Sequence, residues 1–137
     1  MSSPPVTSEN IDNRLNRRAH LVTDTNPETA ADYLVTLNGD AETTDASVRI
    51  FYVPDKFVLQ PNGFAAYLSA LDLEHWDNLE TLALAILDDI NNEVVPRWVQ
   101  ITVQRTTDGT EHGHRVLAED RQPKWDNPPL LARLSQW

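Results

Sequence analysis

The amino-acid sequence predicts an α+β fold in which an antiparallel sheet packs against two helices. Residues 98–105 alternate apolar and polar side chains, as in a strand with one buried face. Residues 47–53 form a second strand by their β-branched and aromatic content. Residues 77–94 repeat apolar side chains every three or four positions, which predicts an amphipathic helix. The complete predicted order is strand, strand, helix, helix, strand, strand.

The first third of the chain is predicted to contain an arm and two strands. Residues 1–18 are polar, with few apolar side chains, and we expect a flexible arm there. Residues 31–38 alternate in a two-residue period and predict the first strand. Residues 38–45 consist mainly of turn-forming residues and predict a long loop. Pro54 ends the second strand.

The two helices are predicted from their start signals. Pro61 opens a short helix for which Asn62 is a candidate cap. The longer helix begins with a capping-box pattern, in which Asp77 accepts a backbone amide and Glu80 reaches back to the cap amide. Pro96 prevents its continuation.

The last third predicts a hairpin and a tail. Asp108-Gly109 is a turn signal between the strand over 98–105 and a returning strand over 114–118. The tail contains prolines and a few leucines, and we expect it to dock on a neighbouring surface. We therefore divide the chain into an arm (1–30), a folded domain (31–120) and a C-terminal tail (121–137).

Composition excludes several classes of function. The 137 residues suit one domain, and a formal charge of −10 repels nucleic-acid phosphates. No apolar run approaches the roughly 20 residues of a membrane span, so we expect a cytoplasmic protein with no membrane partner. The absence of cysteine excludes a thiol nucleophile, a disulfide or a thiolate metal ligand. Two hairpins beside two helices leave sheet edges open, which predicts a homo-oligomer.

Several phrases resemble one protein family. They are Ile50-Phe51-Tyr52-Val53-Pro54-Asp55, Phe64-Ala65-Ala66-Tyr67-Leu68-Ser69, Ile86-Leu87-Asp88-Asp89-Ile90 and Val95-Pro96-Arg97-Trp98. Together with the predicted order of elements, they resemble the tunnelling fold, and within it the 7-cyano-7-deazaguanine reductases of the queuosine pathway. The resemblance covers about residues 45–116. It implies an oligomeric barrel that holds a flat purine-, deazapurine- or pterin-like ring between subunits.

The chain departs from that reductase family at its reactive positions. The family's cysteine nucleophile falls within residues 37–45, which contain no cysteine. The family's run for substrate and NADPH corresponds to residues 60–65, which differ from it, so no cofactor is expected. Of the family's His-Glu pair, only Glu80 has a counterpart. We therefore expect this chain not to be an NADPH-dependent nitrile reductase.

The resemblance also supplies candidate site residues. Gln60 stands where the tunnelling fold anchors its ring, and Phe64 is the neighbouring candidate for ring contact. An amide offers one acceptor and one donor, so Gln60 alone favours a xanthine-like edge over a guanine-like edge. It could equally be a polar loop residue. Glu80 is a candidate general base or ligand for a ring nitrogen, although its capping role alone would explain it. Asp45 is a candidate acid or base in place of the missing thiol, with a solvated loop as the alternative.

His112 and His114 stand at alternate positions at the last predicted hairpin, and on a strand such positions project from one face and can share a metal ion. Metal-dependent synthases of pterin chemistry in the same fold carry a similar His-Gly-His with an upstream histidine, for which His20 is the candidate here. The motif lies on a different strand in those proteins, so we favour two polar residues near a turn and expect no metal. His112 and His114 remain candidates for substrate contact.

These observations lead to one functional hypothesis and two alternatives. The hypothesis is an oligomer that binds a heterocycle and catalyses a non-redox, cysteine-independent step such as hydrolysis, ring opening or cyclisation. The first alternative is a ligand-binding or structural paralogue without catalysis. The second is a metal-dependent lyase of the pterin type.

Overall fold

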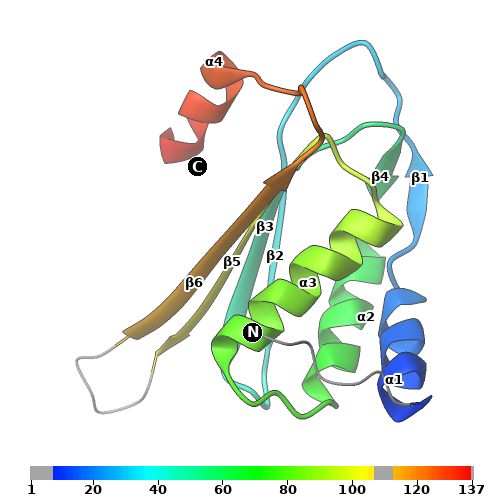
Figure 1. The fold of residues 1–137 in the computed structure, drawn as a ribbon, viewed down its shortest axis with the longest axis vertical. Coiled ribbons are helices and arrows are strands. Elements are labelled where there is room, and N and C mark those ends of the chain that lie inside the picture. Colours follow the sequence, from blue (N-terminus) through cyan, green and yellow to red (C-terminus); the bar gives the residue numbers. More distant parts are fainter. Residues whose placement is uncertain (1–7, 107–112, 137) are drawn as a thin grey trace.

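The computed structural model describes residues 8–106 and 113–136, and its centre is a four-stranded antiparallel sheet. The strand order is β2-β3-β5-β6, formed by Val35–Ala41, Ala46–Val53, Trp98–Thr106 and Gly113–Arg121. Helices α2 (Pro61–Asp72) and α3 (Leu79–Glu93) lie side by side on one face of this sheet (Figure 1). The α+β class and the order of the two hairpins and two helices are therefore confirmed.

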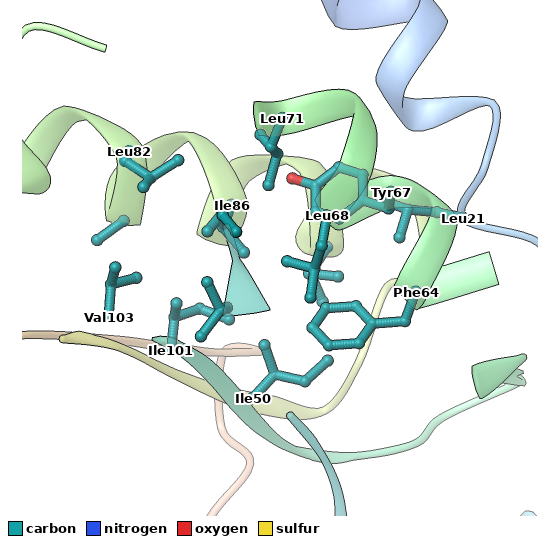
Figure 2. Packing of buried hydrophobic residues seen from close by; sticks show 14 of the residues in the cluster. Leu21, Ile50, Phe64, Tyr67, Leu68, Leu71, Leu82, Ile86, Ile101 and Val103 are labelled. Atoms are coloured by element: carbon teal, nitrogen blue, oxygen red, sulfur yellow. The ribbon is translucent and has the colours of Figure 1, made fainter. Parts of the chain in front are cut away.

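The core lies between the sheet and the two helices (Figure 2). Ile50 of β3 and Ile101 of β5 are directly paired in register, and both are fully buried. Leu68 of α2 and Ile86 of α3 reach the same cluster. Each such side chain contributes about 1.5–3 kcal/mol on burial, so this face of the sheet accounts for most of the packing energy.

The opposite face of the sheet is more polar. Because side chains alternate along a strand, Thr36, Asn38, Arg49 and Phe51 share this second face, where they line a hollow of about 210 Å³. Leu117 of β6 is on the same side of the sheet by register and is 57 % exposed. No helix of the described residues is both long enough and apolar enough to cross a membrane.

The first strand lies later than its pattern predicted. The expected strand over 31–38 and loop over 38–45 are replaced by β2, which runs to Ala41 and pairs with β3 through Asn38 opposite Arg49. Only residues 42–45 form the turn. Both oxygens of Asp72 accept backbone amides of this turn, from Thr43 at 2.8 Å and Thr44 at 2.9 Å. A side chain from α2 thus stabilises a tight turn where the local sequence suggested a long loop.

The expected flexible arm contains regular structure, which corrects that interpretation. Helix α1 (Ser8–Arg18) packs beside α2, and β1 (Thr23–Thr25) pairs with β4 (Phe57–Leu59). Arg17 and Arg18 at the end of α1 bind the buried carboxylate of Asp89 on α3. The charged residues that made the segment look disordered are therefore the residues that attach it to the domain.

The C-terminal tail folds onto the polar face of its own sheet. Helix α4 (Pro128–Leu131) and a 3-10 helix (Ala132–Gln136) bring leucines against Phe51, Val53 and Trp98. Asp32 fastens the tail by accepting hydrogen bonds from the indole of Trp125 at 3.2 Å and the amide of Asn127 at 3.0 Å.

Burial raises the pKa of Asp32, but the hydrogen bonds from Asn127, Arg97 and Trp125 outweigh it and hold the pKa below its usual value. The predicted turn at Asp108-Gly109 lies outside the described residues.

Candidate functional site

Gln60 lies where the β1–β4 ribbon meets the start of α2. Its backbone amide donates to the carbonyl of Val22 at 2.9 Å, and its side-chain Nε2 donates to Oδ1 of Asp24 at 3.0 Å. Gln60 is the N-cap residue of α2, yet its side chain makes no capping hydrogen bond. The expected cap, Asn62, is instead an exposed residue inside the helix. The amide of Gln60 therefore points away from the helix end and remains partly exposed.

Gly63 permits the close approach that places Gln60 there. A Cβ atom at Gly63 would lie 2.4 Å from the backbone oxygen of His20, which is closer than real Cβ contacts. The first turn of α2 therefore packs directly against the backbone that leads into β1. This contact brings Asp24 of β1 within reach of Gln60.

Phe64 does not lie at the surface beside Gln60. It is 2 % exposed and packs on Tyr67, with ring centroids 6.4 Å apart and planes inclined by 26°. Figure 2 shows its ring directed into the core. In the described chain Phe64 therefore has no surface for a ligand, contrary to the contact expected for it.

Glu80 and His114 form a carboxylate–imidazole pair at the other end of the helical layer. Oε1 of Glu80 lies 2.6 Å from Nε2 of His114, and the two side chains are 54 % and 50 % exposed. Glu80 is in the first turn of α3, and His114 is the second residue of β6. A short hydrogen bond that leaves both groups half accessible suits proton exchange with a bound molecule.

The N-cap of α3 lies one residue later than predicted, so the Glu80 side chain has no capping role. Asn78 is the N-cap of α3, and its side chain accepts the amide of Thr81 at 2.7 Å. Glu80 does not complete a box with Asp77. A hydrogen bond to its own backbone amide and one from His114 lower the pKa of Glu80. The Glu80 side chain is therefore a carboxylate at neutral pH that can accept hydrogen bonds, and His114 is its partner.

Asp45 lies at the same end of the sheet but outside this pair. It ends the turn before β3 with a positive φ of 54°, and its side chain is exposed. The register places the start of β3 beside the end of β5, where Arg105 pairs with His114. Strand β5 thus separates Asp45 from His114, and the described residues show no hydrogen bond between them. His112 lies outside the described residues.

The sequence-predicted residues are divided between two ends of the molecule. Gln60 begins α2, whereas Glu80 follows the connection at the far end of that helix. Twelve helical residues span about 18 Å, so α2 alone separates Gln60 from the connection to α3. Figure 1 shows α2 running from the β1–β4 ribbon to this connection. Within one chain, Gln60 and Glu80 do not meet.

The histidine set proposed for a metal is not assembled in the described part of the chain. His20 precedes β1 and its backbone touches Gly63 at the start of α2, while His114 lies beside the start of α3. Across residues 8–106 and 113–136, no three histidine, aspartate or glutamate side chains gather as metal ligands would. Within the described residues, the metal-dependent lyase therefore has no metal site.

A buried ionic cluster around Asp89 was not predicted. Asp89 is fully buried and accepts hydrogen bonds from Arg17 Nε at 2.6 Å, Arg18 Nε at 2.5 Å and the Tyr67 hydroxyl at 2.5 Å. Burial, followed by the charge of Asp89, raises the pKa of Tyr67 well above its usual value. One signal was visible in the sequence, since Asp89 falls three residues after Ile86 on the apolar stripe of α3.

Comparison with known proteins gives a reductase relative. No family model matches the chain. It is 30 % identical over 111 residues to NADPH-dependent 7-cyano-7-deazaguanine reductases from two strains of Nitratidesulfovibrio vulgaris, DP4 and Hildenborough. The match covers 81 % of this chain and 64 % of each relative, so the chain spans less than two thirds of those proteins.

Among solved structures, the apo form of the archaeosine synthase QueF-Like superposes with a TM-score of 0.49 and 19 % identity, over 69 % of this chain and 95 % of that one. The sequence similarity relates the chain to the 7-cyano-7-deazaguanine reductases.

Proposed function

We propose that this chain adopts the tunnelling fold, assembles into an oligomer and binds a purine-, deazapurine- or pterin-like ring between subunits. It then catalyses a non-redox step that uses no thiol, such as hydrolysis, ring opening or cyclisation. The observation that carries this proposal is the Glu80–His114 pair, with 2.6 Å between carboxylate and imidazole in a half-exposed position. The reductase relationship supports the choice of ring.

The pair supplies acid–base chemistry. The lowered pKa of Glu80 keeps its carboxylate ionised, so Glu80 accepts a proton or an N–H bond from a ring nitrogen. Only Nε2 of His114 is engaged by Glu80, so its second ring nitrogen is available to substrate or water. Because the chain has no cysteine, a covalent thioimide on this chain is excluded. Proton transfer alone is enough for addition or removal of water.

The separation of Gln60 from Glu80 favours a site built from two copies of the chain. In one copy these residues lie at opposite ends of α2, so a ring held by both must lie between subunits. Within the described residues, β2 and β6 are the edge strands of the sheet, and neither pairs with a further strand. Each edge can therefore pair with another copy of the chain. Pairing of such edges would close the sheets of several copies into a barrel.

The test uses Glu80→Gln and His114→Asn beside the wild type. Native mass spectrometry of each protein as purified, and after incubation with purine- and pterin-type rings, reports oligomer size and bound mass. Chromatography of the incubation mixtures reports conversion. We expect an oligomer that retains a ring, with conversion lost in both variants. A wild-type monomer that binds none of these rings would overturn the proposal.

One alternative keeps support from the sequence. The chain has no cysteine thiol, and its residues 60–65 differ from the segment with which the reductases bind substrate and NADPH. Both differences also fit a paralogue that binds a ring without converting it. Binding with no conversion by the wild type would favour this alternative over the enzyme.

A further inference from the structure

A pocket of about 430 Å³ lies between the C-terminal tail and the segment that leads into β2. Three apolar and two polar side chains line it, namely Leu34, Pro129, Leu130, Arg133 and Gln136. Leu34 and Leu130 also pack against the buried cluster that holds the tail on the sheet, so both sides of the pocket are attached to the domain. This volume, with mainly apolar walls and few polar groups, is typical of a site for a small molecule.

Arg133, on the 3-10 helix of the tail, is a cation without an acidic partner. It is exposed and makes no ion pair or hydrogen bond with any described residue. The nearest acids in the sequence are already engaged, since Asp126 binds Arg121 at 3.1 Å. Asp32, two residues before Leu34, binds Arg97 at 2.8 Å. In a chain with a formal charge of −10, an unpaired guanidinium beside apolar walls favours an anionic ligand.

We propose that this pocket binds a small carboxylate with an apolar body, such as an aromatic or short-chain acid. The apolar walls contact the body, and the guanidinium of Arg133 binds the carboxylate through two N–H donors. One guanidinium compensates one charge, so in this acidic chain a carboxylate with a single charge is favoured over a phosphate group that carries nearly two.

The pocket is separate from the proposed ring site. Seven residues of β6, or roughly 23 Å of strand, separate His114 from Arg121, after which the tail begins. Figure 1 shows α4 beyond the end of β6, opposite the end at which β6 starts. The inference therefore goes beyond the proposed function and does not depend on it.

Naphthoate and its neutral amide, naphthamide, provide the test, because they share one ring system and differ in charge. Isothermal titration calorimetry at neutral pH gives the ratio of the two dissociation constants for wild type, Arg133→Gln and Lys124→Gln. Lys124 is exposed in the same tail and does not line the pocket, so Lys124→Gln removes the same charge at a neighbouring place.

The wild type should prefer naphthoate about tenfold, as expected for a hydrogen bond to a charged group, and Arg133→Gln should lose this preference. Lys124→Gln should retain it. If Arg133→Gln binds neither compound, Arg133→Lys decides, because it keeps the charge and should again prefer naphthoate; its failure to do so would count against the proposal.

Two further results would overturn the proposal. One is a wild type that binds naphthoate with a dissociation constant above about 1 mM, or no better than naphthamide. The other concerns Trp137, which follows Gln136 in the sequence and lies outside the described residues. If naphthoate binds only after Trp137 is deleted, the chain itself is the occupant of the pocket.

Discussion

Replacing Arg17 with methionine should destabilise the domain strongly, because it removes one partner of a buried carboxylate. Arg17 is 6 % exposed and its guanidinium binds both Asp89 and Glu74. Burial lowers the pKa of Arg17, but the hydrogen bond and charge of Asp89 outweigh it and raise that pKa, so the guanidinium stays charged. Methionine keeps the apolar stem but offers no donor to either acid.

The magnitude follows from what remains around Asp89. Removing one member of a buried ion pair costs about 3–5 kcal/mol when the other charge is left alone. Asp89 keeps two donors in the variant, from Arg18 and the Tyr67 hydroxyl, so we expect a loss nearer 3 kcal/mol, on the order of a third of the stability of such a domain. The melting temperature should fall by roughly 10 °C.

Urea unfolding followed by tryptophan fluorescence and far-UV circular dichroism measures this loss. Arg14→Met is the matched control, since Arg14 lies on the same helix and makes no ion pair in the described residues. Its effect should stay within about 0.5 kcal/mol. The combined variant Arg17→Met with Asp89→Leu should recover part of the loss, because the buried carboxylate is removed together with its partner. The recovery is incomplete because Glu74 loses Arg17 and the Tyr67 hydroxyl loses its acceptor. Equal stabilities of Arg17→Met and Arg14→Met would refute the role assigned to the cluster.

Three further predictions concern the other elements. Gly63→Ala should destabilise by about 1–3 kcal/mol in thermal unfolding, because the added methyl meets the backbone that precedes β1; a neutral result would show that this contact relaxes freely. The folded state lowers the pKa of Asp32, so the ionised Asp32 carboxylate stabilises the fold above the unfolded pKa of about 3.9. This stabilisation is lost as the pH falls through the folded pKa. Trp125 emission should therefore shift to the red in acid, and already at pH 7 in Asp32→Asn; an unshifted spectrum in that variant would contradict the docking of the tail. Asn78→Ala should cost about 1 kcal/mol in urea unfolding and Asp77→Ala much less, because Asn78 is the cap; the reverse order would restore the predicted capping box.

The helices and central strands were predictable because burial on one side leaves a periodic pattern. Ile86 and Ile90 on α3, and Val99, Ile101 and Val103 on β5, repeat with the periods of their elements and are all fully buried. Such patterns need only the element itself and one apolar neighbour. This is why the order of hairpins and helices could be read without tertiary information.

The errors arose where distant residues decide the local structure. The turn over residues 42–45 is fixed by Asp72, and α1 is attached through Asp89, 72 residues after Arg17. Neither partner can be identified from the local sequence. In contrast, the displaced cap at Asn78 reflects a choice between two adjacent cap-forming residues that composition alone does not decide.

The sequence proposed residues for the candidate site but not their arrangement. Gln60 and Glu80 were both identified through the family resemblance, and the structure places them at opposite ends of α2. The contacts of Glu80 with His114 and of Gln60 with Asp24 join segments that are 34 and 36 residues apart. Sequence spacing carries no information on such pairs.

A mixing experiment tests whether two copies of the chain share the proposed ring site. Gln60→Ala and His114→Ala are each prepared as oligomers, then dissociated, mixed and reassembled, and pterin binding is titrated by fluorescence before and after mixing. Each variant alone should bind weakly, and the mixture should regain strong binding in a fraction of its sites, since some interfaces then combine an intact Gln60 with an intact His114. Mixtures that bind no better than the separate variants, although mass spectrometry shows mixed oligomers, would contradict it.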